Sequence, residues 1–115
     1  MTDSSNKYHQ AFEYLDKMST SEKLKFFDNL LFVFTIAGRA IWSDETATDE
    51  AKLDALKWLN ELTHRIWNIR FDIEEQQNAI HLLREVMQEH AGHSPLLRQQ
   101  LIPSFLIAFE SFQTN

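Results

Sequence analysis

The amino-acid sequence predicts an all-α protein, a single-domain up-and-down helical bundle of four main helices plus a short N-terminal helix. Apolar residues recur at helical spacing along almost the whole chain, which is the main signal for helices. Glycine and proline are scarce, with two of each, whereas a protein of many strands needs more turn residues. The 115 residues suffice for one hydrophobic core, and no repeat or change of composition divides them.

The first helix is expected over residues 7–17. Tyr8, Ala11, Phe12 and Leu15 follow the i, i+3, i+4, i+7 spacing of one apolar helix face. The preceding polar segment, residues 1–6, is expected to be disordered, and it lacks the basic and apolar regions of a secretion signal. The sequence therefore predicts a cytoplasmic protein.

The second helix is expected over Thr20–Trp42. Ser19 and Glu22 have the spacing of a capping box, in which each side chain binds a backbone amide of the other. Leu31–Ile36 is rich in residues that also favour strands, so a strand is the alternative there. Helix is favoured because helical periodicity continues on both sides of this run and no turn brackets it.

The third helix, Asp49–Asp72, is preceded by a polar, acidic loop and is apolar over more than one face. One stripe consists of Ala55, Trp58, Leu59, Leu62, Ile66 and Ile69. A second stripe consists of Leu53, Leu56, Trp67 and Phe71. The polar face holds Asp54, Lys57, Glu61, Arg65 and Asn68, and its charges are spaced for a ladder of ion pairs.

The fourth helix is expected to open at Asp72, which would act as its cap, and to end near Ala91. Gly92 would close it in the left-handed conformation. Ser94 and Pro95 suit the start of the last helix, and Pro103 is expected to kink that helix or split it.

The second stripe of the third helix predicts a binding surface. A bundle helix normally needs one apolar stripe, so Leu53, Leu56, Trp67 and Phe71 are the candidate partner-binding residues. Phe32 and Ile36 also lie off the main stripe of their helix. The alternative is that the N-terminal and last helices cover the second stripe within one chain.

Composition excludes several classes of function. There is no cysteine, so disulfides and thiolate chemistry are absent. The net charge is −6 and the basic residues are scattered, so direct nucleic-acid binding is not expected. The most apolar run, Leu30–Trp42, is too short to span a bilayer, and no membrane association is expected. No cofactor is expected.

Histidines and carboxylates do not form a recognisable metal site. Glu61 and His64 are one turn apart, but the second such pair that a di-iron bundle uses is missing. His81 points to a different side of its helix from His90 and His93. No metal is therefore expected, and Gly38 is assigned to close helix packing.

The segment from Arg84 to His90 resembles the R-x(4–6)-H signature of the HEPN ribonucleases, which are small all-α domains. The resemblance implies RNA cleavage with Arg84 and His90 as catalytic residues. The residue after the arginine is usually small and polar in that family, whereas here it is Glu85. Glu85 and Glu89 oppose the approach of a phosphate, so Arg84 and His90 are expected to be surface or boundary residues without a catalytic role.

The preferred interpretation is a small acidic interaction protein, not an enzyme. It would bind and regulate a protein partner, as inhibitors, antitoxins and immunity proteins do, or form a homodimer, or both. A HEPN-like ribonuclease domain using Arg84 and His90 is the alternative. The acidic stretch Asp44–Asp54 is either a mimic of nucleic-acid phosphates or solvated surface.

Overall fold

The protein is all-α in the computed structural model, which describes the backbone of residues 2–114 and the side chains of residues 6–113. The described chain forms five helices and no strand: α1 (Thr2–Asp16), α2 (Thr20–Trp42), α3 (Asp49–Phe71), α4 (Ala79–Ala91) and α5 (Pro95–Thr114). The predicted fold class is confirmed.

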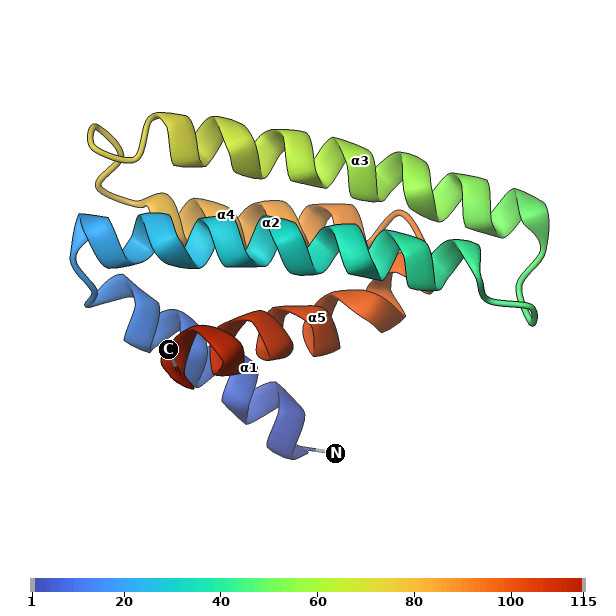
Figure 1. The fold of residues 1–115 in the computed structure, drawn as a ribbon, viewed down its shortest axis with the longest axis horizontal. Helices are drawn as coiled ribbons and strands as arrows, with labels where there is room; N and C mark the ends of the chain where they lie inside the picture. The colour runs from blue at the N-terminus through green and yellow to red at the C-terminus, as the bar shows by residue number, and fades with distance from the viewer. Residues whose placement is uncertain (1, 115) are drawn as a thin grey trace.

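Helices α2 to α5 run alternately up and down, and each is antiparallel to the next (Figure 1). α2 packs between α3 and α5, and α3 packs on α4. α1 crosses the lower side of the bundle in this view and packs on α4 and α5. The molecule measures 42 × 30 × 24 Å. The loops α2–α3 and α3–α4 lie at opposite ends of its long axis.

Local capping sets the starts of α2 and α3 as predicted. The Ser19 hydroxyl accepts a hydrogen bond from the Glu22 amide at 3.2 Å, and the Glu22 carboxylate accepts one from the Ser19 amide at 3.3 Å. The Thr48 hydroxyl accepts from the Ala51 amide at 3.1 Å. The strand alternative for residues 31–36 is wrong, because this segment is a continuous part of α2.

The start of α4 is a correction. Asp72 does not open this helix: it follows the last residue of α3, with its amide donating to the Asn68 carbonyl. Residues 72–75, 77 and 78 form turns, and the buried side chain of Ile73 fixes this connection to the core. The chain uses this segment to cross from α3 to α4, so α4 begins only at Ala79.

The expectation for the end of α4 is also revised, and one of the two alternatives for Pro103, a split helix, is wrong. Gly92 has φ −67° and ψ −18°, so it stays right-handed and its amide donates to the carbonyls of Gln88 and Glu89. α5 is not split at Pro103 but continues through it. Pro103 and Gln99 are both exposed, so water can reach the Gln99 carbonyl that lacks its helical donor. The Ser94 cap is as predicted, accepting from the Leu97 amide at 3.1 Å.

The N-terminal helix is longer than predicted. α1 begins at Thr2 instead of near residue 7. Residues 2–6 of the segment expected to be disordered therefore belong to this helix, and Met1 lies outside the described residues.

The core is centred on Phe105 of α5, which is fully buried. Its ring stacks on Phe12 of α1, with centroids 4.6 Å apart, and meets Tyr8 edge-on at 5.2 Å. On its other side it contacts the ring of Phe26 of α2 at 5.6 Å. One side chain therefore joins three helices, and such aromatic contacts add to the free energy gained from burial.

We expect Phe105→Ala to lower the free energy of unfolding by about 3–5 kcal/mol, because it removes a large buried ring and leaves a cavity. Urea unfolding followed by circular dichroism measures this change. Ile107→Ala, two residues along the same helix but exposed, is the control and should stay within about 0.5 kcal/mol. Equal losses in the two variants would contradict the central position of Phe105.

Stability should fall in alkali because of Tyr8. Burial raises the pKa of its phenol to about 12, against a smaller opposing effect of Arg84. Above pH 10 the unfolded chain releases this proton while the folded chain keeps it, so the free energy of unfolding decreases as the pH rises. Between pH 9 and 11.5 the wild type should lose about 2 kcal/mol more than Tyr8→Phe in urea unfolding. Identical losses would contradict the assignment.

Candidate partner-binding face

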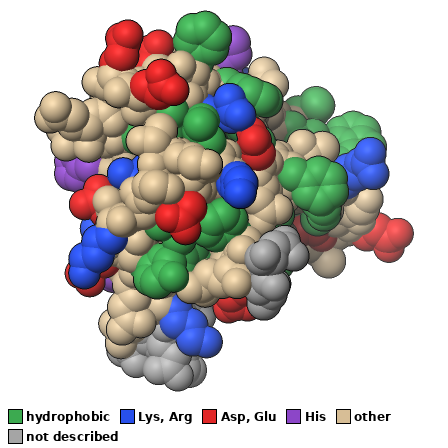
Figure 2. Space-filling view, turned by 60° about the vertical axis from the view of Figure 1, so that its left-hand side comes forward, with side chains coloured by type: hydrophobic (Ala, Val, Ile, Leu, Met, Phe, Trp, Pro, Cys, Tyr) green, Lys and Arg blue, Asp and Glu red, His purple; other side chains and the backbone are tan. Residues whose placement is uncertain are grey.

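Large apolar side chains are exposed on the outward sides of α2 and α3. We call this surface the outer face and define it by Phe32, Ile36 and Trp42 of α2 and Leu53, Trp67 and Phe71 of α3. Phe32 is 65% exposed, Trp67 52% and Phe71 86%. In the view of Figure 2, hydrophobic side chains reach the surface in separate groups with charged side chains of both signs between them.

The outer face exists because α2 and α3 are apolar on two sides. The core side of α2 buries Phe27, Leu30 and Phe34, whereas Phe32 and Ile36, one turn apart, point the other way. In α3 the buried stripe includes Leu59, Leu62 and Ile66, as predicted. Among the described residues no helix covers Leu53, Trp67 and Phe71 of the other stripe, and α1 packs on α4 and α5. The alternative that the terminal helices cover it is therefore wrong.

One of the four candidate partner-binding residues differs from the rest. Leu53, Trp67 and Phe71 are exposed, but Leu56 is half-buried against α2. A Cβ atom on Gly38 of α2 would lie 3.7 Å from Leu56 Cδ2 and 3.3 Å from Leu59 Cδ2. Gly38 thus permits close packing of α2 on α3, as the sequence predicted, and Leu56 fills part of that contact.

A groove runs between α2 and α3 on the outer face. One hollow of about 310 Å³ is lined by Asp28, Leu31, Phe32, Thr35, Thr63 and Trp67. The next hollow, of about 300 Å³, shares Thr35 and Thr63 and also reaches Gly38 and Leu56. The groove therefore has an apolar floor and aromatic walls at one end, and a polar middle.

A two-point ion pair bridges the groove at its Trp67 end. Arg70 of α3 donates from Nε to Asp28 Oδ1 at 2.6 Å and from Nη2 to Oδ2 at 3.1 Å. This contact raises the pKa of Arg70. The guanidinium also lies 5.6 Å from the centre of the Trp67 ring and so orients the indole.

The other end of the outer face adjoins the α2–α3 loop. Lys52 lies 5.9 Å from the centre of the Trp42 ring. In the loop, the Asp44 carboxylate accepts hydrogen bonds from the Thr46 hydroxyl at 2.6 Å and the Thr46 amide at 2.9 Å. These bonds lower the pKa of Asp44, so its charge is retained in mildly acidic solution.

Arg84 and His90 do not form a common site. Arg84 contacts His9 of α1 and lies 5.5 Å from the centre of the Phe12 ring. His90 faces α3 instead, with its ring centroid 6.0 Å from that of Trp58. The two side chains thus contact different helices, and the geometry offers no place where both could reach one phosphate.

His90 is a core residue, which corrects the expectation of a surface or boundary position. It is 2% exposed, and its Nδ1 is 2.9 Å from the Val86 carbonyl oxygen. A helical stripe of buried residues leads to it through Ile80, Leu83 and Met87. His90 follows Met87 at the same helical spacing, and this spacing is the signal in the sequence that predicts its burial.

The remaining polar candidates are dispersed. Glu61 and His64 are exposed on α3, His81 pairs with Glu85 at 2.8 Å, and His93 stacks on Trp58 with centroids 3.9 Å apart. The described residues contain no group of three or more His, Asp or Glu that could hold a metal ion. The ladder expected along α3 is not formed among the described residues: Arg65 instead reaches Glu89 of α4 at 4.0 Å.

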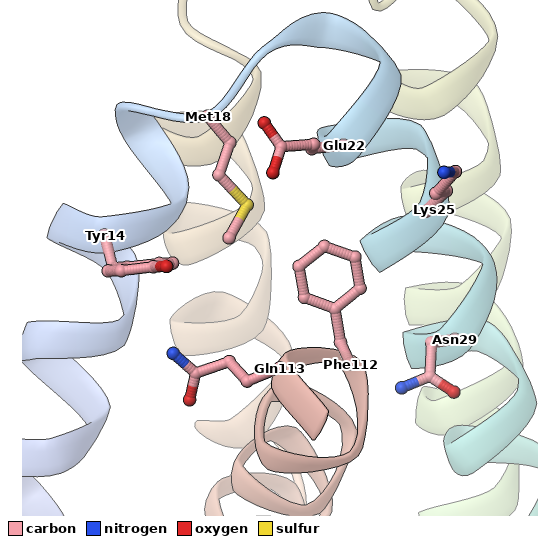
Figure 3. A pocket seen from close by; sticks show the side chains of 7 residues that line it. All are labelled: Tyr14, Met18, Glu22, Lys25, Asn29, Phe112 and Gln113. Atoms are coloured by element: carbon pink, nitrogen blue, oxygen red, sulfur yellow. The ribbon is translucent and has the colours of Figure 1, made fainter. Parts of the chain in front are cut away.

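Another cleft, of about 540 Å³, lies away from the outer face, between α1, α2 and the end of α5. Met18 and Phe112 point toward one another in it, with Glu22 and Lys25 near its upper rim and Tyr14 and Gln113 on the opposite side (Figure 3). Glu22 is already engaged in the capping box of α2. Asn29 donates to the Ala108 carbonyl at 2.7 Å, so two of the polar groups serve the fold.

Comparison of the chain with profiles of known protein families, with curated proteins and with solved structures gives no match. None of the helices in the described part of the chain is long and apolar enough to cross a membrane.

Because the outer face is solvent-exposed, polar substitutions there should leave the fold intact. We expect Phe71→Ser to change the free energy of unfolding by less than about 0.5 kcal/mol. Leu62→Ala, on the buried side of the same helix, should cost about 2–5 kcal/mol. Thermal unfolding of the two variants tests this contrast, and a large loss in Phe71→Ser would mean that the outer face is part of the core.

Proposed function

We propose that this protein is a small interaction module that binds a protein partner through the outer face and regulates it by occupying part of its surface. Inhibitors, antitoxins and immunity proteins are functional classes of this kind. The observation that carries the proposal is the exposure of six large apolar side chains on two adjacent helices of one domain.

The size of the outer face fits this role. Taking about 200 Å² for a large side chain, the exposed fractions of the six residues add to roughly 700 Å². A standard protein interface buries about 800 Å² on each partner. The exposed apolar area is thus comparable to that of one side of an interface, and Trp and Phe are suited to anchor a partner.

Catalysis by Arg84 and His90 has less support. A ribonuclease of the HEPN type needs both residues at one phosphate, whereas here Arg84 is held against α1 and His90 is buried beside Trp58. The net charge of −6 favours a basic protein partner over a polyanion. We therefore propose protein binding and no enzymatic activity.

The test compares two matched substitutions. Ile36 on the outer face is 50% exposed and Ile107 on α5 is 58% exposed, so Ile36→Glu and Ile107→Glu add the same charge at similar exposure on different surfaces. In affinity capture from cells of the source organism, a partner should be retained by the wild type and by Ile107→Glu. Ile36→Glu and Trp67→Glu should lose it, because a buried carboxylate at an interface commonly costs several kcal/mol of binding.

Sedimentation of the pure wild-type protein completes the test, because a second copy could itself be the partner. A dimer that dissociates in Ile36→Glu and persists in Ile107→Glu would identify self-association as the function of the outer face. A monomer whose captured proteins are unaffected by Ile36→Glu and Trp67→Glu would overturn the proposal.

A further inference from the structure

We propose that the occupant of the outer face is an amphipathic helix of the partner whose apolar stripe is flanked at both ends by basic residues. This inference rests on the proposed function and specifies its ligand. It is drawn from the distribution of charge around the outer face and from the groove between α2 and α3.

Most of the net negative charge of the chain resides at the two ends of the outer face. At one end, the α2–α3 loop and the first turn of α3 carry Asp44, Glu45, Asp49 and Glu50 against Lys52. At the other end, the α3–α4 loop carries Asp72, Glu74 and Glu75. Arg39 in the last turn of α2 also lies at the first end, and Glu22, Lys23 and Lys25 at the start of α2 lie at the second. With these residues included, each end has a net charge of −2, so the two ends hold −4 of the chain's −6.

Between these ends the outer face is apolar and nearly free of carboxylates. Asp28 is the exception, and its charge is met by the two-point contact with Arg70. Asp54 and Glu61 belong to the polar face of α3, beside Lys57 and Arg65, and not to the groove. A ligand that follows the groove therefore meets negative charge, then apolar surface, then negative charge.

The dimensions suit a helix. α3 has 23 residues, which corresponds to roughly 33 Å between the acidic ends. This separation is several times the Debye length of about 8 Å at physiological ionic strength. The two acidic ends therefore act independently, and each attracts the basic residues at one end of the ligand. Apolar anchors spaced along one face of a helix are the usual ligands of grooves between two helices. The matching partner segment has about 20 residues between its basic ends.

The same charges disfavour a second copy of this chain as the occupant. Two copies placed side by side on their outer faces bring acidic ends together in either the parallel or the antiparallel orientation. Each contact would then oppose a net charge of about −2 to another of about −2, which raises the free energy of association. A helix with basic residues at its ends instead places positive charges against both acidic ends, which lowers the free energy of association.

Three fluorescent synthetic peptides of about 22 residues serve as probes, with binding to the full chain measured by anisotropy. The first has a leucine stripe at helical spacing and three lysines at each end. The second has the same stripe with three glutamates at each end, and the third has the composition of the first in scrambled order. We expect the first to bind at least about tenfold more tightly than the others, and the advantage over the glutamate peptide to shrink in 0.5 M salt.

Two matched pairs of variants locate the binding. Ile36→Glu should weaken binding of the lysine-ended peptide at least about tenfold, whereas Ile107→Glu should not. Glu74→Lys with Glu75→Lys at the α3–α4 loop should weaken it at least about fivefold. Reversing the exposed Glu13 and Asp16 of α1 in the same way changes the net charge equally but should have little effect.

Equal binding of the lysine-ended and scrambled peptides, or equal effects of the two charge-reversed pairs, would overturn the inference, because attraction would then depend on net charge alone. Absence of binding by all three peptides would also overturn it. A captured partner that is lost in Ile36→Glu would in that case still support the proposed function, so the two failures are distinguishable. A dimer that forms through the outer face would also overturn the inference, because the occupant would then be a second copy of this chain and not a basic-ended helix.

Discussion

The packing of Phe105 decides which surfaces of this protein are covered. Its ring contacts the rings of Tyr8 and Phe12 of α1 and of Phe26 of α2. Because α1 is held at this point, it lies along α4 and α5 and does not reach the outward sides of α2 and α3. The apolar outer face is thus a consequence of where the aromatic core binds the N-terminal helix.

Local signals were sufficient to predict most of the helices. The Ser19–Glu22 capping box and the Thr48 cap place the starts of α2 and α3 at the observed residues. The start of α4 was mispredicted because Asp72 has the local features of a cap, whereas the crossing to α4 requires a connection of several residues. That requirement comes from the tertiary arrangement of the helices, which a capping pattern does not contain.

The candidate binding surface was predicted in part. Helical periodicity places Trp67 and Phe71 off the core stripe, and both are exposed. It does not distinguish Leu56, whose burial depends on the close approach of α2 at Gly38. The sequence alone also does not predict that negative charge is concentrated at the two ends of the outer face. That distribution depends on two loops being at opposite ends of the bundle (Figure 1). The burial of His90 follows from its place on the apolar stripe of α4, a pattern that the sequence does contain.

The extensive packing of α5 on α2 has a kinetic consequence. α3 and α4 each pack on the preceding helix of the bundle, so their contacts form between neighbours in the sequence. The α2–α5 interface instead joins segments separated by roughly 50 residues, and closing a loop of this length carries an entropic cost that local contacts avoid. The helical hairpins can therefore assemble quickly, whereas the docking of α5 against α2 is the step expected to set the folding rate.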